Sequence, residues 1–235
     1  MNYIKSEFNR VFETKIICFG IGLISLISFI FGRFILGESM TILLGILANV
    51  SLIYLIACSS SIATEDFEFG TYKNVYTGRY RFIEVIIMKL IVYMLICLVL
   101  SLVVGLISLL NVAVSGESIN LAIIKDTILK KLIIYLICGL CMFSFSQLLG
   151  LTFKSFSLDL IVMFSLFYGI LSELIDLFSR SSEAILSKVV SILPFSIVPK
   201  MIINSELSWF NVSISTISAL IIILLIKLCE KIWFR

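Results

Sequence analysis

The stretch that decides the fold runs from Leu90 to Gly116, LIVYMLICLVLSLVVGLISLLNVAVSG, and contains no charged residue. A helix needs about 20 apolar residues to cross the hydrocarbon core of a bilayer, so this stretch is long enough to span it. The whole chain is similar, with 60% hydrophobic residues, 14% charged residues and a mean hydropathy of +1.17. Such a composition leaves too little polar surface to cover a soluble globule of 235 residues. The sequence therefore predicts an all-α integral membrane protein.

The number of spans follows from the intervals between charged residues. These intervals are 16–32, 39–64, 90–116, 132–153, 160–172 and 207–226. All except 160–172 are long enough to cross. Extending that interval to 156–178 supplies the length, and its charges Asp159, Glu173 and Asp176 then fall near the two membrane surfaces, where ionised groups cost less than at the midplane. We therefore predict six transmembrane helices in one domain, residues 1–235.

Two segments outside these spans have patterns of their own. Residues 1–15 place Ile4, Phe8, Val11 and Phe12 on one helical face, which predicts an interfacial helix along the inner membrane surface, with an ordinary polar leader as the alternative. Residues 179–206 contain both prolines and an apolar stretch too short to cross. We predict a re-entrant helical element there, between helices 5 and 6, because backbone that enters the membrane without crossing must be shielded by protein. An ordered extracellular loop is the alternative.

The orientation follows from the basic residues around the first hairpin. Lys5, Arg10 and Lys15 precede the first span, whereas Arg33 alone follows it. Cytoplasmic flanks carry an excess of Lys and Arg, so we predict that both termini are cytoplasmic.

The residue inventory makes several chemistries improbable. The chain has no histidine, which removes the usual zinc ligand and the commonest general base, and it has no Gly-Lys-Ser or Gly-Lys-Thr of a phosphate-binding loop. Cys138 and Cys141 have the spacing of a redox pair, but all six cysteines lie in or at the ends of apolar intervals, where a thiol acts as a small hydrophobe. We therefore predict a non-enzymatic chain with no catalytic residue, metal site or bound cofactor, and no nucleic-acid partner.

Polar residues within the predicted spans are candidates for a translocation path, because such residues are costly in lipid and tend to face a cavity or the bundle interior. The candidates are Asn49, Ser51, Ser144 and Gln147. Helix packing is the alternative for the serines, and it is the more common role of small residues in membrane helices.

The loop at residues 64–81 interrupts the apolar chain with acidic, aromatic and then basic residues. Phe67, Phe69 and Tyr72 are suited to insert into a groove on a partner, and Gly70 lets the backbone turn. Arg79 and Arg81 then lie at headgroup level, where the third helix begins. A solvated hairpin with basic anchors is the alternative.

This loop, EDFEFGTYKNVYTGRYRFIEVIIMKLI, resembles the cytoplasmic loop of ABC-2 type ABC transporter permeases. The matching positions are Glu65, Gly70, Thr71, Lys73, Asn74, Gly78, Arg81 and Lys89. The predicted layout also resembles that family, with an interfacial helix, six spans and a re-entrant element before the last span.

The resemblance implies a permease subunit in the cell membrane of a Gram-positive bacterium that exports peptides, a group that includes bacteriocin immunity transporters. It implies pairing with a second permease copy or a related permease, and with two cytoplasmic ABC ATPase subunits that bind the ATP and magnesium. The ATPase-coupling residues implied are Glu65, Asp66, Phe67, Glu68, Phe69, Gly70, Thr71, Tyr72, Arg79 and Arg81. Export of lipids or drugs, and an ATP-independent membrane immunity or interaction protein, are the alternatives.

Overall fold

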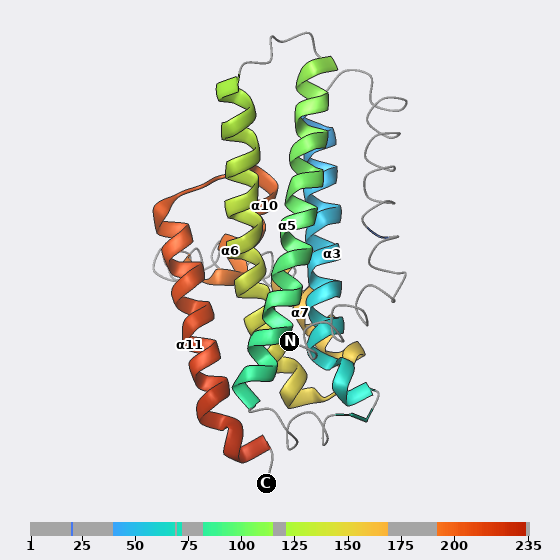
Figure 1. The fold of residues 1–235 in the computed structure, drawn as a ribbon, viewed down its shortest axis with the longest axis vertical. Helices are drawn as coiled ribbons and strands as arrows, with labels where there is room; N and C mark the ends of the chain where they lie inside the picture. Colours follow the sequence, from blue (N-terminus) through green and yellow to red (C-terminus); the bar gives the residue numbers. More distant parts are fainter. Residues whose placement is uncertain are drawn as a thin grey trace, which may run out of the picture.

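The computed structural model describes residues 20, 40–68, 70–71, 82–114, 121–168 and 192–233. Within these residues it consists of helices and contains no strand (Figure 1). The helices are α3 (Met40–Glu68), α5 (Phe82–Val114), α6 (Leu121–Phe153), α7 (Phe156–Phe167), α10 (Pro194–Asn204) and α11 (Trp209–Trp233). By length and composition α3, α5, α6 and α11 can cross a membrane. The prediction of an all-helical membrane protein is confirmed at this level.

Several helices extend past the uncharged intervals that predicted them. Helix α3 continues to Glu68, so residues 64–68, which we had assigned to the loop, are helical. Helix α5 begins at Phe82 and therefore includes Lys89, and α6 begins at Leu121, ahead of several charged residues. The differences have a physical cause: an uncharged interval reports the thickness of the hydrocarbon layer, whereas a helix can include charged residues that are paired within the protein, as Asp66 and Lys89 are, or that lie beyond that layer.

Some predictions fall on residues that the structure does not describe. The interfacial helix at 1–15 lies outside the described residues, and Gly20 is the one described residue of the first predicted span, 16–32. Gly20 lies against α3, because a Cβ built on it would come within 2.7 Å of Cε2 of Tyr54. The predicted fifth span is described only through α7 and Tyr168, and α7 has 12 residues, fewer than a crossing needs. The six-span count therefore stays a prediction.

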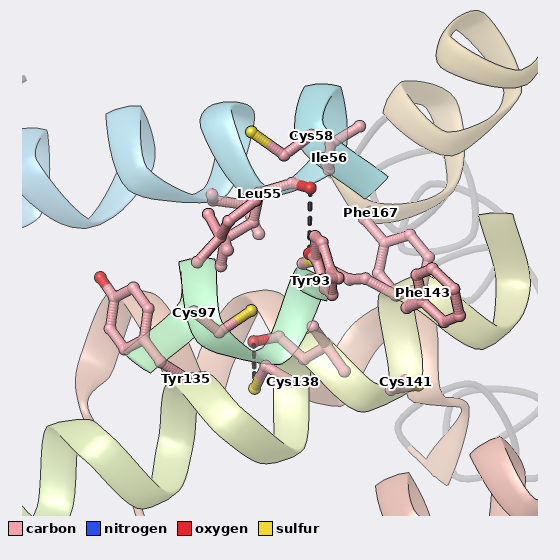
Figure 2. Packing of buried hydrophobic residues seen from close by; sticks show 14 of the residues in the cluster. Leu55, Ile56, Cys58, Tyr93, Cys97, Tyr135, Cys138, Cys141, Phe143 and Phe167 are labelled. Atoms are coloured by element: carbon pink, nitrogen blue, oxygen red, sulfur yellow. Dashed lines mark hydrogen bonds between the residues drawn. The ribbon is translucent and has the colours of Figure 1, made fainter. Parts of the chain in front are cut away.

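Helices α3, α5 and α6 form the centre of the bundle (Figure 1). Gly139 lets α5 and α6 approach closely, since a Cβ there would lie 2.5 Å from Sγ of Cys97. One turn further along α6, the ring of Phe143 stacks on that of Tyr93, with their centroids 5.6 Å apart. The Tyr93 hydroxyl donates a hydrogen bond of 3.0 Å to the carbonyl of Leu55, which ties α5 to α3 (Figure 2).

Helices α7 and α10 pack on α3 and α6, and α11 packs on α6. The Phe195 ring of α10 lies 4.7 Å from that of Phe145 in α6 and 5.4 Å from that of Phe167 in α7, measured between centroids, so an aromatic cluster joins three helices. Helix α11 runs along α6 at the edge of the bundle (Figure 1) and exposes many large apolar side chains. Such a face is suited to lipid or to another membrane protein.

Candidate functional site

The candidate site lies at one end of the bundle, where α3 ends at Glu68, α5 begins at Phe82 and α6 ends at Phe153; we call it the loop end. After the last turn of α3 the backbone reverses at Gly70, which has a φ of +65° and donates its N–H to the carbonyl of Phe67 at 3.3 Å. A left-handed residue directly after a helix is usually glycine, because a side chain at this φ is strained.

An ion pair anchors this turn. The Nζ atom of Lys89 lies 2.6 Å from Oδ2 of Asp66, and neither side chain is exposed to solvent. The same ammonium group donates a hydrogen bond of 2.9 Å to the carbonyl of Ile62. The Thr71 hydroxyl reaches back to the carboxylate and to the backbone carbonyl of Asp66, at 3.4 Å in each case. The end of α3, the turn and the second turn of α5 are thereby held together.

This ion pair matters more for the relative position of α3 and α5 than for the net stability of the fold. Removing two charges from water costs free energy that offsets much of their attraction, so a buried ion pair adds little net stability. Losing one partner is different, because it leaves a buried charge without compensation. The pair therefore fixes how the end of α3 lies relative to α5. Sequence reasoning included Lys89 in the family resemblance but gave it no role; the available signal was a single lysine at the edge of the longest apolar interval.

The predicted coupling residues divide by accessibility. Glu65 and Asp66 are buried, and the Phe67 side chain is partly buried and packs on the hydrophobic core, so these residues face the interior. Glu68 and Gly70 are exposed and are the described positions most open to a partner. Thr71 is described and half-buried, whereas Phe69, Tyr72, Arg79 and Arg81 lie outside the described residues.

A further buried carboxylate, Asp159, lies in the first turn of α7. We had expected Asp159 near a membrane surface; within the protein its side chain is fully buried among helices, and its depth in the membrane stays a prediction. The Ser146 hydroxyl of α6 donates a hydrogen bond of 2.7 Å to its Oδ2 atom, and Ser60 of α3 faces the same carboxylate. The Oδ1 atom of Asp159 and the Oγ atom of Ser60 have no hydrogen-bond partner of good geometry. The sequence did not predict this burial within the bundle, where the Ser146 hydroxyl supplies part of the polar surroundings that a buried carboxylate needs.

Of the four candidates for a translocation path, Asn49 lines a cavity formed by described residues, and the other three are buried. Ser51 is buried and shares a hydrogen bond with the Tyr135 hydroxyl, and Ser144 is buried and donates to the carbonyl of Leu140 at 2.8 Å. These contacts are the ones expected of helix packing, the alternative given above, and a role in a path stays a prediction. Gln147 is fully buried, and neither its amide nitrogen nor its oxygen has a hydrogen-bond partner. Asn49 donates to the carbonyl of Gly45 at 2.9 Å and lines a cavity.

This cavity lies between α3, α7 and α10 and has a volume of about 180 Å³. Its lining includes Asn49, Phe167, Tyr168, Phe195, Lys200 and Asn204. Sequence reasoning identified Asn49 alone of these, because the other residues come from helices far apart in the chain, and their proximity depends on how α7 and α10 pack.

The cysteine pair of the sequence CGLC faces two different neighbours. The Cys138 thiol lies 3.8 Å from the carbonyl of Val198 in α10, and Figure 2 shows this contact, whereas the Cys141 thiol lies 3.7 Å from the hydroxyl of Ser218 in α11. Each thiol fills a separate helix contact, which favours a packing role. Among the described residues no group of His, Cys, Asp and Glu side chains is arranged to hold a metal ion.

Comparison of the chain with protein-family models gave no match, and comparison with curated proteins gave no significant match.

The ion pair generates the first prediction. Lys89→Met should lower the free energy of unfolding by about 3–5 kcal/mol, because the buried Asp66 carboxylate loses its cation. The double variant Asp66→Leu with Lys89→Met should recover most of this loss, since no buried charge remains. Thermal unfolding of the purified chain in detergent measures both effects. Lys227→Met, at an exposed lysine of α11, is the control. A double variant as unstable as the single one would contradict this account.

Gln147 generates the second prediction. Burying a polar group without a hydrogen bond costs about 1–3 kcal/mol in proteins, so Gln147→Leu should raise the unfolding temperature. Ser51→Ala is the matched comparison and should lower it, because the buried Tyr135 hydroxyl loses its partner. The same detergent assay compares the two. A lower unfolding temperature for Gln147→Leu would show that the amide has a stabilising partner in the working protein.

Proposed function

We propose that this chain is the permease subunit of an ATP-driven exporter of the ABC-2 type. In this proposal it lies in a bacterial cell membrane with both termini cytoplasmic, pairs with a second permease, and binds a separate ATPase subunit at the loop end. Its cargo is a peptide or another amphipathic molecule. The observation that carries the proposal is the turn at Gly70 and its anchoring by the ion pair between Asp66 and Lys89.

An ATPase on the cytoplasmic side has to pass its movement to helices that cross the membrane. A loose loop would absorb such a movement in its own backbone torsions. Here the exposed positions Glu68 and Gly70 lie next to an ion pair that joins α3 to α5. A force applied at the turn therefore displaces two long helices together, which is the property a coupling element needs.

The direction of the chain supports the six-span arrangement of this proposal. Lys131 of α6 donates a hydrogen bond of 2.8 Å to the hydroxyl of Ser205, just before α11, and Cys141 further along α6 contacts Ser218 of α11. From the first contact to the second, the residue numbers rise along both helices, so α6 and α11 are parallel (Figure 1). If both cross the membrane, the segment between them must return across it, and α7 begins that return.

The contacts of α10 support its re-entrant placement. Near its start Phe195 packs on Phe145 of α6, and directly after its end Ser205 bonds Lys131, much nearer the other end of α6. Helix α10 therefore runs alongside the part of α6 that we assign to the membrane. Its 11 residues are too few to cross, and neighbouring helices shield its backbone.

The topology generates the third prediction. In a variant without its six native cysteines, a single cysteine at position 182, replacing Ser182, should react with a membrane-impermeant thiol reagent added to intact cells. A cysteine replacing Ser155, at the start of α7, should react only after the cells are opened. The reagent reaches only the outer surface of intact cells, so labelling of position 155 in such cells would rule out the six-span arrangement.

The turn generates the fourth prediction. Gly70→Val should abolish co-purification of the ATPase, because a β-branched residue at positive φ costs roughly 1–2 kcal/mol or more and forces the exposed turn to change shape. Gly70→Asn is the matched control, since asparagine tolerates this conformation. A Cβ at this position meets no atom within 4 Å, so the difference reports backbone conformation and not a clash.

The readout is the amount of ATPase that co-purifies with the permease, together with substrate-stimulated ATP hydrolysis. Membrane insertion and dimer formation are measured in parallel and should be unchanged in both variants. If Gly70→Val keeps normal ATPase binding and export, the turn is a solvated hairpin and the ATP-independent alternative is favoured.

A further inference from the structure

The cavity between α3, α7 and α10 has a size that limits what it can hold. Its volume is about 180 Å³. A cavity of about 150 Å³ lined by apolar side chains accommodates a benzene molecule, whereas sites for drug-sized ligands measure about 300–1,000 Å³. The cavity therefore fits one amino-acid side chain or a group of similar size, and it is too small for the two acyl chains of a membrane lipid.

One face of α10 supplies much of the lining. Phe195, Pro199 and Ile203 follow one another at intervals of four residues, and so do Ser196, Lys200 and Asn204. Residues four apart lie on the same side of a helix, so the first row gives an apolar strip and the second a polar strip beside it. Both strips line the same cavity, which therefore has an apolar part and a polar part.

The apolar part is aromatic. Phe167 and Tyr168 end α7, and the Phe195 ring meets that of Phe167 edge to face, with their centroids 5.4 Å apart. Aromatic rings prefer such edge-to-face or offset contacts, so the fully buried Phe167 holds the half-buried Phe195 ring in place, and Phe195 and the exposed Tyr168 present a surface to a further ring or branched side chain.

The polar part carries positive charge. Lys200 is exposed and lines the cavity with the amides of Asn49 and Asn204, and the lining contains no acidic residue. An ammonium group beside amide donors is suited to a carboxylate. A ligand that satisfies both parts has an apolar side chain close to a carboxylate.

We propose that this cavity binds the C-terminal residue of a peptide, with its apolar side chain among the aromatic rings and its free carboxylate at Lys200. The carboxylate and the side chain of such a residue share one carbon atom, which matches the adjacent polar and apolar strips of α10. The choice of a peptide as ligand rests on the proposed export function. The binding chemistry itself needs no ATPase.

The test uses the full-length chain in phosphatidylcholine nanodiscs and the probe N-acetyl-4-fluoro-L-phenylalanine, followed by fluorine NMR line broadening. The free acid should bind, and its carboxamide should bind at least tenfold more weakly because the negative charge is lost. N-acetylglycine, which has the carboxylate but no side chain, should fail to compete. Equal binding of the acid and the amide would overturn the proposal.

Variants at α10 locate the site. Lys200→Gln should weaken binding of the acid at least tenfold and leave binding of the amide unchanged, whereas Lys200→Arg should retain binding of the acid. Lys227→Gln, at an exposed lysine of α11 outside the cavity, is the matched control. Unchanged binding of the acid to the Lys200→Gln variant would place the probe elsewhere and overturn the proposal.

A lipid phosphate is the competing source of negative charge. Nanodiscs that contain phosphatidylglycerol should leave probe binding unchanged; displacement of the probe by this lipid would assign the cavity to lipid and overturn the peptide proposal. Failure here is distinct from failure of the exporter proposal, because ATPase co-purification is measured without the probe. A chain that binds the probe but never binds an ATPase would refute the exporter and keep the peptide site.

Discussion

The buried ion pair between Asp66 and Lys89 is the constraint on which the arrangement of the loop end depends. Lipid tails are as apolar as the helix surfaces, so burial of apolar area does little to select one helix register over another in a membrane. Close approach of two helix backbones and polar contacts between helices do select one register. Gly139 lets α6 approach Cys97 of α5, and the Tyr93 hydroxyl bonds the carbonyl of Leu55 in α3. The ion pair adds a third restraint at the end where α3 turns toward α5.

Those restraints explain what the sequence could and could not predict. Lipid thickness imposes long apolar runs, so the all-helical membrane class and the four long described helices were predictable from uncharged intervals alone. Helix ends were not, because charged residues such as Lys89 continue a helix when a partner is available. The turn at Gly70 was predictable because left-handed backbone favours glycine. The burial of Asp66, the partly buried Phe67 ring and the position of Asp159 depend on contacts between helices, which no local pattern encodes.

For the candidate residues of a translocation path, too, the sequence alone could not predict which contacts each side chain makes. A polar residue in an apolar run can face a cavity, bond a neighbouring helix or remain without a partner, and its residue type does not distinguish these cases. Asn49 lines the cavity, Ser51 bonds Tyr135, and Gln147 is buried with no partner for its amide. Only the packing of α3 against α6, α7 and α10 separates the three outcomes.

Helix α3 connects the two features to which we assign function. Asn49 lines the cavity near one end of α3, and Asp66 holds the turn at the other, about 25 Å away along a helix with a rise of 1.5 Å per residue. The helix contains no proline between Met40 and Glu68 and continues without a break over that range. Proline is a common cause of a kink and α3 has none, so in the proposed exporter a movement of the turn would be passed along this helix. Because α3 also packs on α7 and α10, such a movement shifts one wall of the cavity relative to the other two. In the proposed exporter, α3 would therefore carry a movement of the turn to the cavity.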